Sequence, residues 1–258
     1  PTAAKRADVP YFLVDLIDPD QEMTVKEFQR QARAAREAAT AAGRPCLYVG
    51  GTGLYARAVL DDLEIPGRFP EARDALEADA ANDLAALYAR LVTLDPVAAA
   101  RMEPTNERRV VRALEVTLGS GRAFSSYGEG LGDYGAVNVP QVGLRVDPAE
   151  VDRRIDERFH RWLDEGLLDE VRALAARPAG LSRTARQAVG YRELLRHVED
   201  GVALSACVAD ALSASRRLAR RQRRWFARDP RIEWFDDVGA ARRRLVAALN
   251  DARPEVRD

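Results

Sequence analysis

The chain has 258 residues, of which 47% are hydrophobic and 31% are charged. These values are typical of a folded protein and exclude a disordered or collagen-like chain. The length allows one large domain or two smaller ones. With a net charge of −1, the protein as a whole has no positive electrostatic field that would attract nucleic acid. Any basic surface must therefore be local.

The sequence shows no signal for a membrane or a metal. No apolar run reaches the roughly 18 residues of a membrane span, and no signal peptide opens the chain. Cys46 and Cys207 lie far apart and, with His160 and His197, form no metal-ligand spacing. We therefore expect a cytoplasmic protein without membrane contact and without a bound zinc ion.

The first part of the chain predicts alternating strands and helices. Apolar runs at residues 10–17 and 45–49 predict two buried strands. Between them, Thr24 is a good helix cap and Gly43 a good helix stop. Residues 54–60 resume helical spacing. This order predicts a parallel sheet with right-handed crossovers.

The middle of the chain predicts a helical insert. Residues 71–119 follow a helical pattern, and a loop rich in glycine and serine continues to residue 135. A strand is expected within residues 137–146, and helices resume at Pro148, a favourable first-turn position. We therefore predict an α/β core of residues 1–66 and 136–258, interrupted by a mainly helical domain at residues 67–135. A last short strand is expected at residues 231–235.

A glycine turn, residues 50–53, separates the second predicted strand from its helix. Its glycines let the backbone approach a ligand closely, and the helix start offers free N–H groups to an anion or a polar base. Thr52 adds a hydroxyl at the same place. The alternative is a tight turn that binds nothing.

One helix face in the insert carries a cluster of guanidinium groups. Arg108, Arg109 and Arg112 lie three or four residues apart, a spacing that suits phosphates and stacked bases. Alternatively, this face is solvated and its arginines pair with Glu107 and Glu115.

Two later segments also combine arginine with a shared face or an aromatic ring. Arg154 and Arg158 lie on one helix face that suits a diphosphate, unless they pair with Asp152 and Asp156. In residues 184–193, a glycine interrupts a polar helical stretch beside a tyrosine and two arginines. Such a segment can stack a splayed nucleotide, or it is a helix break with a packed tyrosine.

Residues 216–231 carry the strongest signal, eight arginines with a single acid. Arg217, Arg221, Arg224 and Arg228 form an arginine stripe with the spacing i, i+4, i+7 and i+11. Because like charges at this spacing destabilise a helix, we infer that a polyanion such as RNA supplies the compensating charge. The alternative is that these arginines pair with acids elsewhere on the protein.

Taken in order, these segments resemble the tRNA dimethylallyltransferase family, also called tRNA isopentenylpyrophosphate transferases. The similarity runs through residues 13–19, 49–55, 109–116, 154–158, 166–171, 187–193 and 221–226. A single glycine turn would be uninformative, but this many spaced segments in one order are specific.

The resemblance implies a fold related to P-loop kinases, a parallel sheet flanked by helices, with an insert that grips tRNA. It implies transfer of a dimethylallyl group from dimethylallyl diphosphate to N6 of the adenosine 3′ of the anticodon, usually with Mg²⁺. The base would be flipped out, since N6 is unreachable while the base is stacked. The expected partners of a monomeric protein are therefore the tRNA anticodon stem-loop and dimethylallyl diphosphate.

The resemblance implies site residues at the positions of this sequence that match the family's segments. Thr52 is expected to position the base, and Arg158 to bind the donor's diphosphate. Contacts to tRNA are expected at Thr52, Arg73, Arg108, Arg109, Arg112, Arg186, Gln187, Gly190, Tyr191, Arg192, Arg220, Arg221, Gln222, Arg224 and Trp225. Arg108 replaces a usual glutamine, and Arg223 with Arg224 replace an apolar–threonine pair.

The family also has an N-terminal P-loop and a catalytic aspartate, which this sequence does not contain. We therefore expect an N-terminally incomplete transferase that is inactive as it stands. Two alternatives stay open, a non-catalytic RNA-binding remnant and an adenylate (cytokinin-type) isopentenyltransferase. The arginine stripe favours tRNA over adenylate, because a mononucleotide has no use for an extended basic surface.

Overall fold

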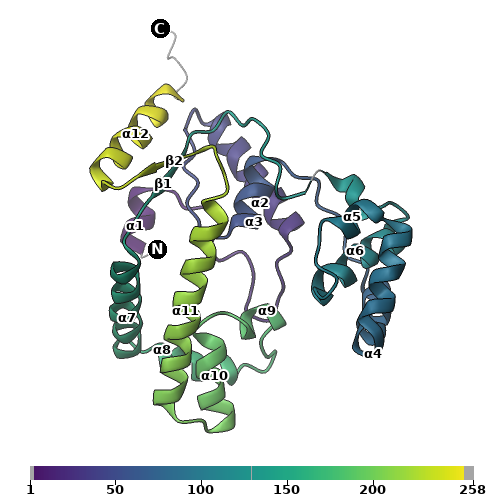
Figure 1. The fold of residues 1–258 in the computed structure, drawn as a ribbon. Coiled ribbons are helices and arrows are strands. Elements are labelled where there is room, and N and C mark those ends of the chain that lie inside the picture. The colour runs from purple at the N-terminus through teal and green to yellow at the C-terminus, as the bar shows by residue number, and fades with distance from the viewer. Residues whose placement is uncertain (1–2, 129, 253–258) are drawn as a thin grey trace. The chain divides into compact units, whose positions relative to one another are not determined.

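The structure is a computed structural model that describes residues 3–128 and 130–252 (Figure 1). It divides into two compact units, one from the described parts of Pro1–Ala56 and Asn138–Asp258, the other Arg57–Val137. The first unit contains a small parallel sheet and the second is helical. The predicted α/β class with a mainly helical part is confirmed. None of the described helices is long and apolar enough to cross a membrane.

Local signals set the ends of several helices in the first unit. Thr24 caps α2 (Val25–Ala41) by accepting the N–H of Glu27 at 3.1 Å, and Gly43 follows the helix with φ of +63°. α7 begins at Pro148, as predicted. The unit also contains α1 (Ala3–Asp8), α8 (Leu167–Ala175), α9 (Arg183–Arg186), α10 (Tyr191–Asp200), α11 (Leu204–Phe226) and α12 (Val238–Asp251).

The described sheet has two strands, β1 (Gln141–Leu144) and β2 (Ile232–Phe235). They pair in parallel, with Gln141 opposite Ile232 and Leu144 opposite Phe235. Both strands were predicted from sequence. The core of this unit lies elsewhere, among α7, α8, α10 and α11, around Phe159, Val171, Leu194, Leu195, Cys207 and Ala211.

The prediction of two buried strands at residues 10–17 and 45–49 is wrong for this structure. Neither run is a strand, and most of their apolar side chains are exposed; Val49 is 88% exposed. A strand needs a neighbour for its backbone groups, and neither run pairs with β1 or β2. Leu13 and Asp15 also have positive φ, which breaks the extended conformation of the first run.

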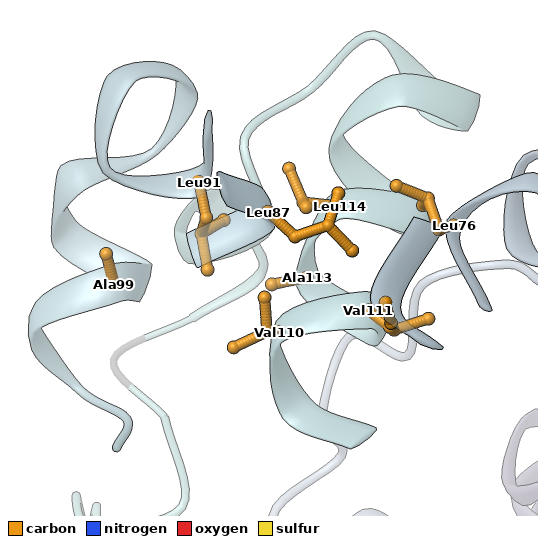
Figure 2. Packing of buried hydrophobic residues seen from close by; sticks show 9 residues of the cluster. Leu76, Leu87, Leu91, Ala99, Val110, Val111, Ala113 and Leu114 are labelled. Carbon is orange, nitrogen blue, oxygen red and sulfur yellow. The ribbon is translucent and has the colours of Figure 1, made fainter. Parts of the chain in front are cut away.

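The second unit is built on α4 (Pro70–Leu94), α5 (Pro96–Ala100), α6 (Glu107–Ser120) and the 3₁₀ turn η1 (Phe124–Tyr127). It begins within α3 (Gly53–Leu60). Figure 2 shows its core, in which α4 packs against α6 through Leu76, Leu87, Leu91, Val110, Val111, Ala113 and Leu114. α4 kinks at Asp83, where φ is −150°.

A buried arginine ties α3 to a distant loop of the same unit. Arg57 forms an ion pair with Asp61 and donates hydrogen bonds to the carbonyls of Leu131 at 3.2 Å and Asp133 at 2.5 Å. Its guanidinium also lies 4.4 Å from the ring centroid of Tyr134. These contacts hold residues 131–134 against the end of α3.

Candidate functional site

The glycine turn packs directly against α11, which lies about 170 residues later in the sequence. A Cβ atom at Gly51 would lie 2.7 Å from Nε2 of Gln222, and one at Gly53 would lie 1.9 Å from Nε1 of Trp225. The Trp225 ring leaves room only for glycine at position 53, whereas the end of the flexible Gln222 side chain is what a Cβ at position 51 would displace. Thr52 lies between them and starts α3, its carbonyl accepting the N–H of Ala56 at 3.0 Å.

Three polar groups at this contact are available to a ligand. The Thr52 hydroxyl, the Gln222 amide and the Trp225 indole N–H make no hydrogen bond to any residue that the structure describes. The three side chains are exposed or half-buried. An aromatic ring, an amide and a hydroxyl at a helix start can together stack a base and bind its polar edge.

The arginines of α11 divide into two groups. Arg216 is held by Asp156, with its Nη2 2.5 Å from Oδ2, and Arg220 lies 3.6 Å from Asp152, so this group faces α7. The arginine stripe lies on a neighbouring face of α11, about a quarter turn around the helix. Its members Arg221, Arg224 and Arg228 are exposed and have no acidic partner within residues 3–128 and 130–252. Arg228 follows the end of the helix.

The described residues therefore do not neutralise the stripe. Its first member, Arg217, donates to the hydroxyl of Ser213 at 2.6 Å rather than to an acid. Arg221 is four residues before Trp225 and so shares a helix face with it. Guanidinium groups without an acidic partner in the described residues thus lie along α11 beside the glycine turn. Such a row suits the phosphates of a bound polyanion.

On α7, the two predicted diphosphate arginines have different surroundings. Arg154 donates to Glu150 at 2.6 Å, and the hydrogen bonds from Arg153 and Arg154 hold the pKa of Glu150 at about 2. The exposed guanidinium of Arg158 instead lies 4.9 Å from the ring centroid of Trp162, with no acid paired to it in the described residues. Arg158 is thus the one of the two that can bind an anion without first breaking an ion pair.

We expect Arg158→Ala, in a full-length context, to raise the Michaelis constant for dimethylallyl diphosphate about tenfold or more while tRNA affinity stays close to wild type. A lost charge-assisted hydrogen bond costs about 1.5–3 kcal/mol, which is tenfold or more in affinity. Steady-state kinetics with varied donor, and filter binding of tRNA, measure the two effects. Arg154→Ala is the matched control and should change the donor constant little. The reverse pattern, with tRNA binding weakened and donor kinetics intact, would move Arg158 to the RNA surface.

The segment predicted at residues 184–193 is held by internal contacts. Arg186 pairs with Glu199, Arg192 with Glu193, and the Tyr191 hydroxyl donates to Glu170 at 2.8 Å. Burial and this hydrogen bond raise the pKa of Tyr191 to about 12.

A helix start explains the glycine in this segment. Gly190 has φ of +94°, a backbone conformation that favours glycine, and its N–H donates to the buried carboxylate of Glu193 at 2.9 Å. Gln187, also predicted to contact tRNA, is exposed at the end of α9. The contacts of this segment account for the start of α10 without a ligand.

In the second unit, the predicted arginines again form two groups. Arg108 and Arg109 are exposed at the start of α6 and have no acidic partner in the described chain. Arg73 and Arg112 both bind Glu115, at 3.1 Å and 2.7 Å. Burial lowers the pKa of Arg112, and the nearby charges of Arg73 and Arg68 lower it further, against the opposing effect of Glu115.

Sequence reasoning treated Glu115 only as a possible partner on a solvated face and did not single out Glu193. Both are buried, at 0% and 2% exposed. The signal for Glu115 was its neighbours, since Val110, Val111, Leu114 and Val116 make this face apolar. A carboxylate among such residues needs a fixed partner.

The described residues contain no cluster of side chains that by itself identifies a metal site. No group of three or more histidine, cysteine, aspartate or glutamate residues in them is arranged to hold a metal ion. The magnesium ion implied by the resemblance therefore stays a prediction, and we assign no step to it.

Comparison with known proteins places the chain among related sequences. The profile of the IPP transferase family matches residues 1–229. A tRNA dimethylallyltransferase of Salinispora tropica is 43% identical over 258 residues, which are 99% of this chain and 79% of that protein. One of Saccharopolyspora erythraea is 45% identical over 253 residues, covering 97% of this chain and 81% of its own length.

Solved structures show the same relationship. The tRNA isopentenylpyrophosphate transferase of Bacillus halodurans superposes with a TM-score of 0.67 at 30% identity, covering 98% of this chain and 82% of its own. A eukaryotic dimethylallyltransferase acting on tRNA superposes with a TM-score of 0.76 over the whole of this chain and 69% of its own. At 21% identity, it shows a common fold.

Proposed function

The chain belongs to the IPP transferase family, and on that premise we propose that it transfers a dimethylallyl group from dimethylallyl diphosphate to tRNA. The proposed acceptor is N6 of the adenosine 3′ of the anticodon. In the reaction, N6 forms a bond to C1 of the dimethylallyl group while the bond from C1 to the diphosphate oxygen breaks. The diphosphate leaves with the electron pair, and N6 loses one proton.

The observation that carries this proposal is the contact between the glycine turn and α11. It gathers three unpartnered polar side chains, Thr52, Gln222 and Trp225, beside a row of exposed arginines. The polar groups suit a flipped-out base, and the arginines suit the phosphates that flank it. Arg158 would offset the charge that develops on the departing diphosphate.

The test is a transfer assay in a full-length context, with isotopically labelled dimethylallyl diphosphate and tRNA, followed by nuclease digestion and mass spectrometry of the nucleosides. The proposal predicts label on the adenosine 3′ of the anticodon. Unlabelled AMP should compete far less well than an anticodon stem-loop. Equal competition by AMP would support an adenylate isopentenyltransferase, and tRNA binding without any transfer would support an RNA-binding role.

We expect Thr52→Val, in a full-length context, to reduce turnover far more than it reduces tRNA affinity. The substitution keeps the shape of the side chain but removes the hydroxyl at the start of α3. Loss of one hydrogen bond to a bound polar partner costs about 1–3 kcal/mol, or roughly 5- to 150-fold. Single-turnover rates and filter binding measure the two quantities on one preparation. Equal losses in both would count against a role for Thr52 at the reacting base.

A further inference from the structure

We propose that Glu115 is a positioning residue that holds Arg73 and Arg112 in the orientation in which they contact the phosphates of tRNA. This inference rests on the tRNA-binding function proposed above. It concerns a buried side chain that itself touches no ligand and acts through two partly exposed ones.

One carboxylate joins three donors from different parts of the second unit. Oε1 of Glu115 accepts the backbone N–H of Phe69 at 3.0 Å and Nη1 of Arg112 at 2.7 Å. Oε2 accepts Nη1 of Arg73 at 3.1 Å. Arg73 lies in the first turn of α4, whereas Glu115 and Arg112 lie in α6, so the carboxylate fixes the two helices and both guanidinium groups together.

The burial of this carboxylate is costly, which is difficult to explain by stability alone. The Glu115 side chain is 1% exposed and lies in the sequence between the core residues Leu114 and Val116. Well-packed apolar residues often replace buried ion pairs without loss of stability. What this buried charge holds is one backbone N–H and two guanidinium groups.

The two arginines face outward from the carboxylate. The side chain of Arg73 is 32% exposed and that of Arg112 is 27% exposed. A second contact fixes each guanidinium, because Arg112 donates to the carbonyl of Pro66 at 3.0 Å and Arg73 pairs with Glu77 at 2.7 Å. Planar groups held at two points retain N–H donors in a fixed direction, which suits phosphate oxygens.

The start of α4 is fixed by the same contacts. Phe69 precedes the helix and makes no side-chain cap, so the buried carboxylate from α6 satisfies its N–H instead. The Phe69 ring lies where a Cβ at Gly119 would be, 2.2 Å from its Cγ. Arg73 therefore projects from a helix whose first turn is tied to α6 at two places.

The main test is Glu115→Gln in the full chain. The amide oxygen can still accept the Phe69 N–H, but the charge that orients the guanidinium groups is lost. We expect the Michaelis constant for tRNA to rise about tenfold, with turnover at saturating tRNA retained. Glu64→Gln is the matched control, since its partner Arg122, at 2.9 Å, is not a predicted tRNA contact. It should leave the tRNA constant unchanged.

A double-mutant cycle separates positioning from a merely structural role. If Glu115 acts through Arg112, then Arg112→Gln should weaken tRNA binding much less in the Glu115→Gln background than in the wild type. Additive losses, or a lower melting temperature with unchanged tRNA kinetics, would overturn the proposal.

A second variant keeps the test decisive if Glu115→Gln does not fold. Arg112→Lys keeps the charge but loses the planar fork, so it should weaken tRNA binding severalfold with little change in salt dependence. Wild-type affinity in Arg112→Lys would overturn positioning. Failure of the wild-type protein to bind tRNA would instead overturn the proposed function, so the two failures are distinguishable.

Discussion

Replacing Arg221 and Arg224 together by glutamine should flatten the salt dependence of RNA binding by roughly one to two units of slope. Each phosphate contact that an arginine neutralises releases counterions, which contributes about −0.7 to −0.9 to the slope of log affinity against log salt. The loss should be similar for cognate and non-cognate RNA, because phosphate contacts do not read sequence. The helix should persist, since glutamine is nearly as good a helix former as arginine. A salt titration and a melting curve on one sample measure both effects.

The matched control removes the same charge from arginines that are already neutralised. Arg216 pairs with Asp156 and Arg231 with Asp229 at 2.6 Å. The double variant Arg216→Gln/Arg231→Gln should lower the melting temperature and leave the slope unchanged. If both double variants flatten the slope equally, the effect comes from total charge and the exposed side of α11 is not the binding surface.

Of the single glycine-to-alanine substitutions in the glycine turn, Gly53→Ala should reduce stability and turnover most. Its Cβ would lie 1.9 Å from Nε1 and 2.1 Å from Cδ1 of Trp225, so the indole or the helix must move. Overpacking of this kind costs about 1–3 kcal/mol, which corresponds to a fall in melting temperature of roughly 3–10 °C. Turnover should fall further, because the displaced ring belongs to the proposed base site. Calorimetry and the transfer assay measure the two losses.

The neighbouring Gly50 provides the control for that substitution. A Cβ at Gly50 would have nothing within 4 Å, so Gly50→Ala adds the same methyl group to open space. Its melting temperature should match that of the wild type. An unchanged melting temperature in Gly53→Ala as well would show that Trp225 does not pack on the turn.

The sequence predicted best those features that local chemistry determines. Thr24, Gly43 and Pro148 mark helix ends because each acts on backbone groups within a few residues of itself. The runs at residues 10–17 and 45–49 were mistaken for strands because an apolar run reports a preference for burial, whereas a strand depends on a partner elsewhere in the chain.

The site was predictable in composition but not in arrangement. The spacing of arginines in α11 placed several of them on one face, but only the packing of α7 shows that Arg216 and Arg220 are the ones with acidic partners. Likewise, no local pattern relates Gly53 to Trp225, since their contact depends on the tertiary fold. The family resemblance selected these residues, and the structure supplies the reason that glycine is needed beside them.

The contacts of Arg57 bring the two ends of the second unit close together. Because its guanidinium reaches the carbonyls of both Leu131 and Asp133, the chain enters and leaves this unit at nearly the same place. Segments whose ends are adjacent are the ones that tolerate excision and grafting. A short turn could therefore replace residues 57–137 in this chain. The same residues could also be inserted into a surface loop of another protein.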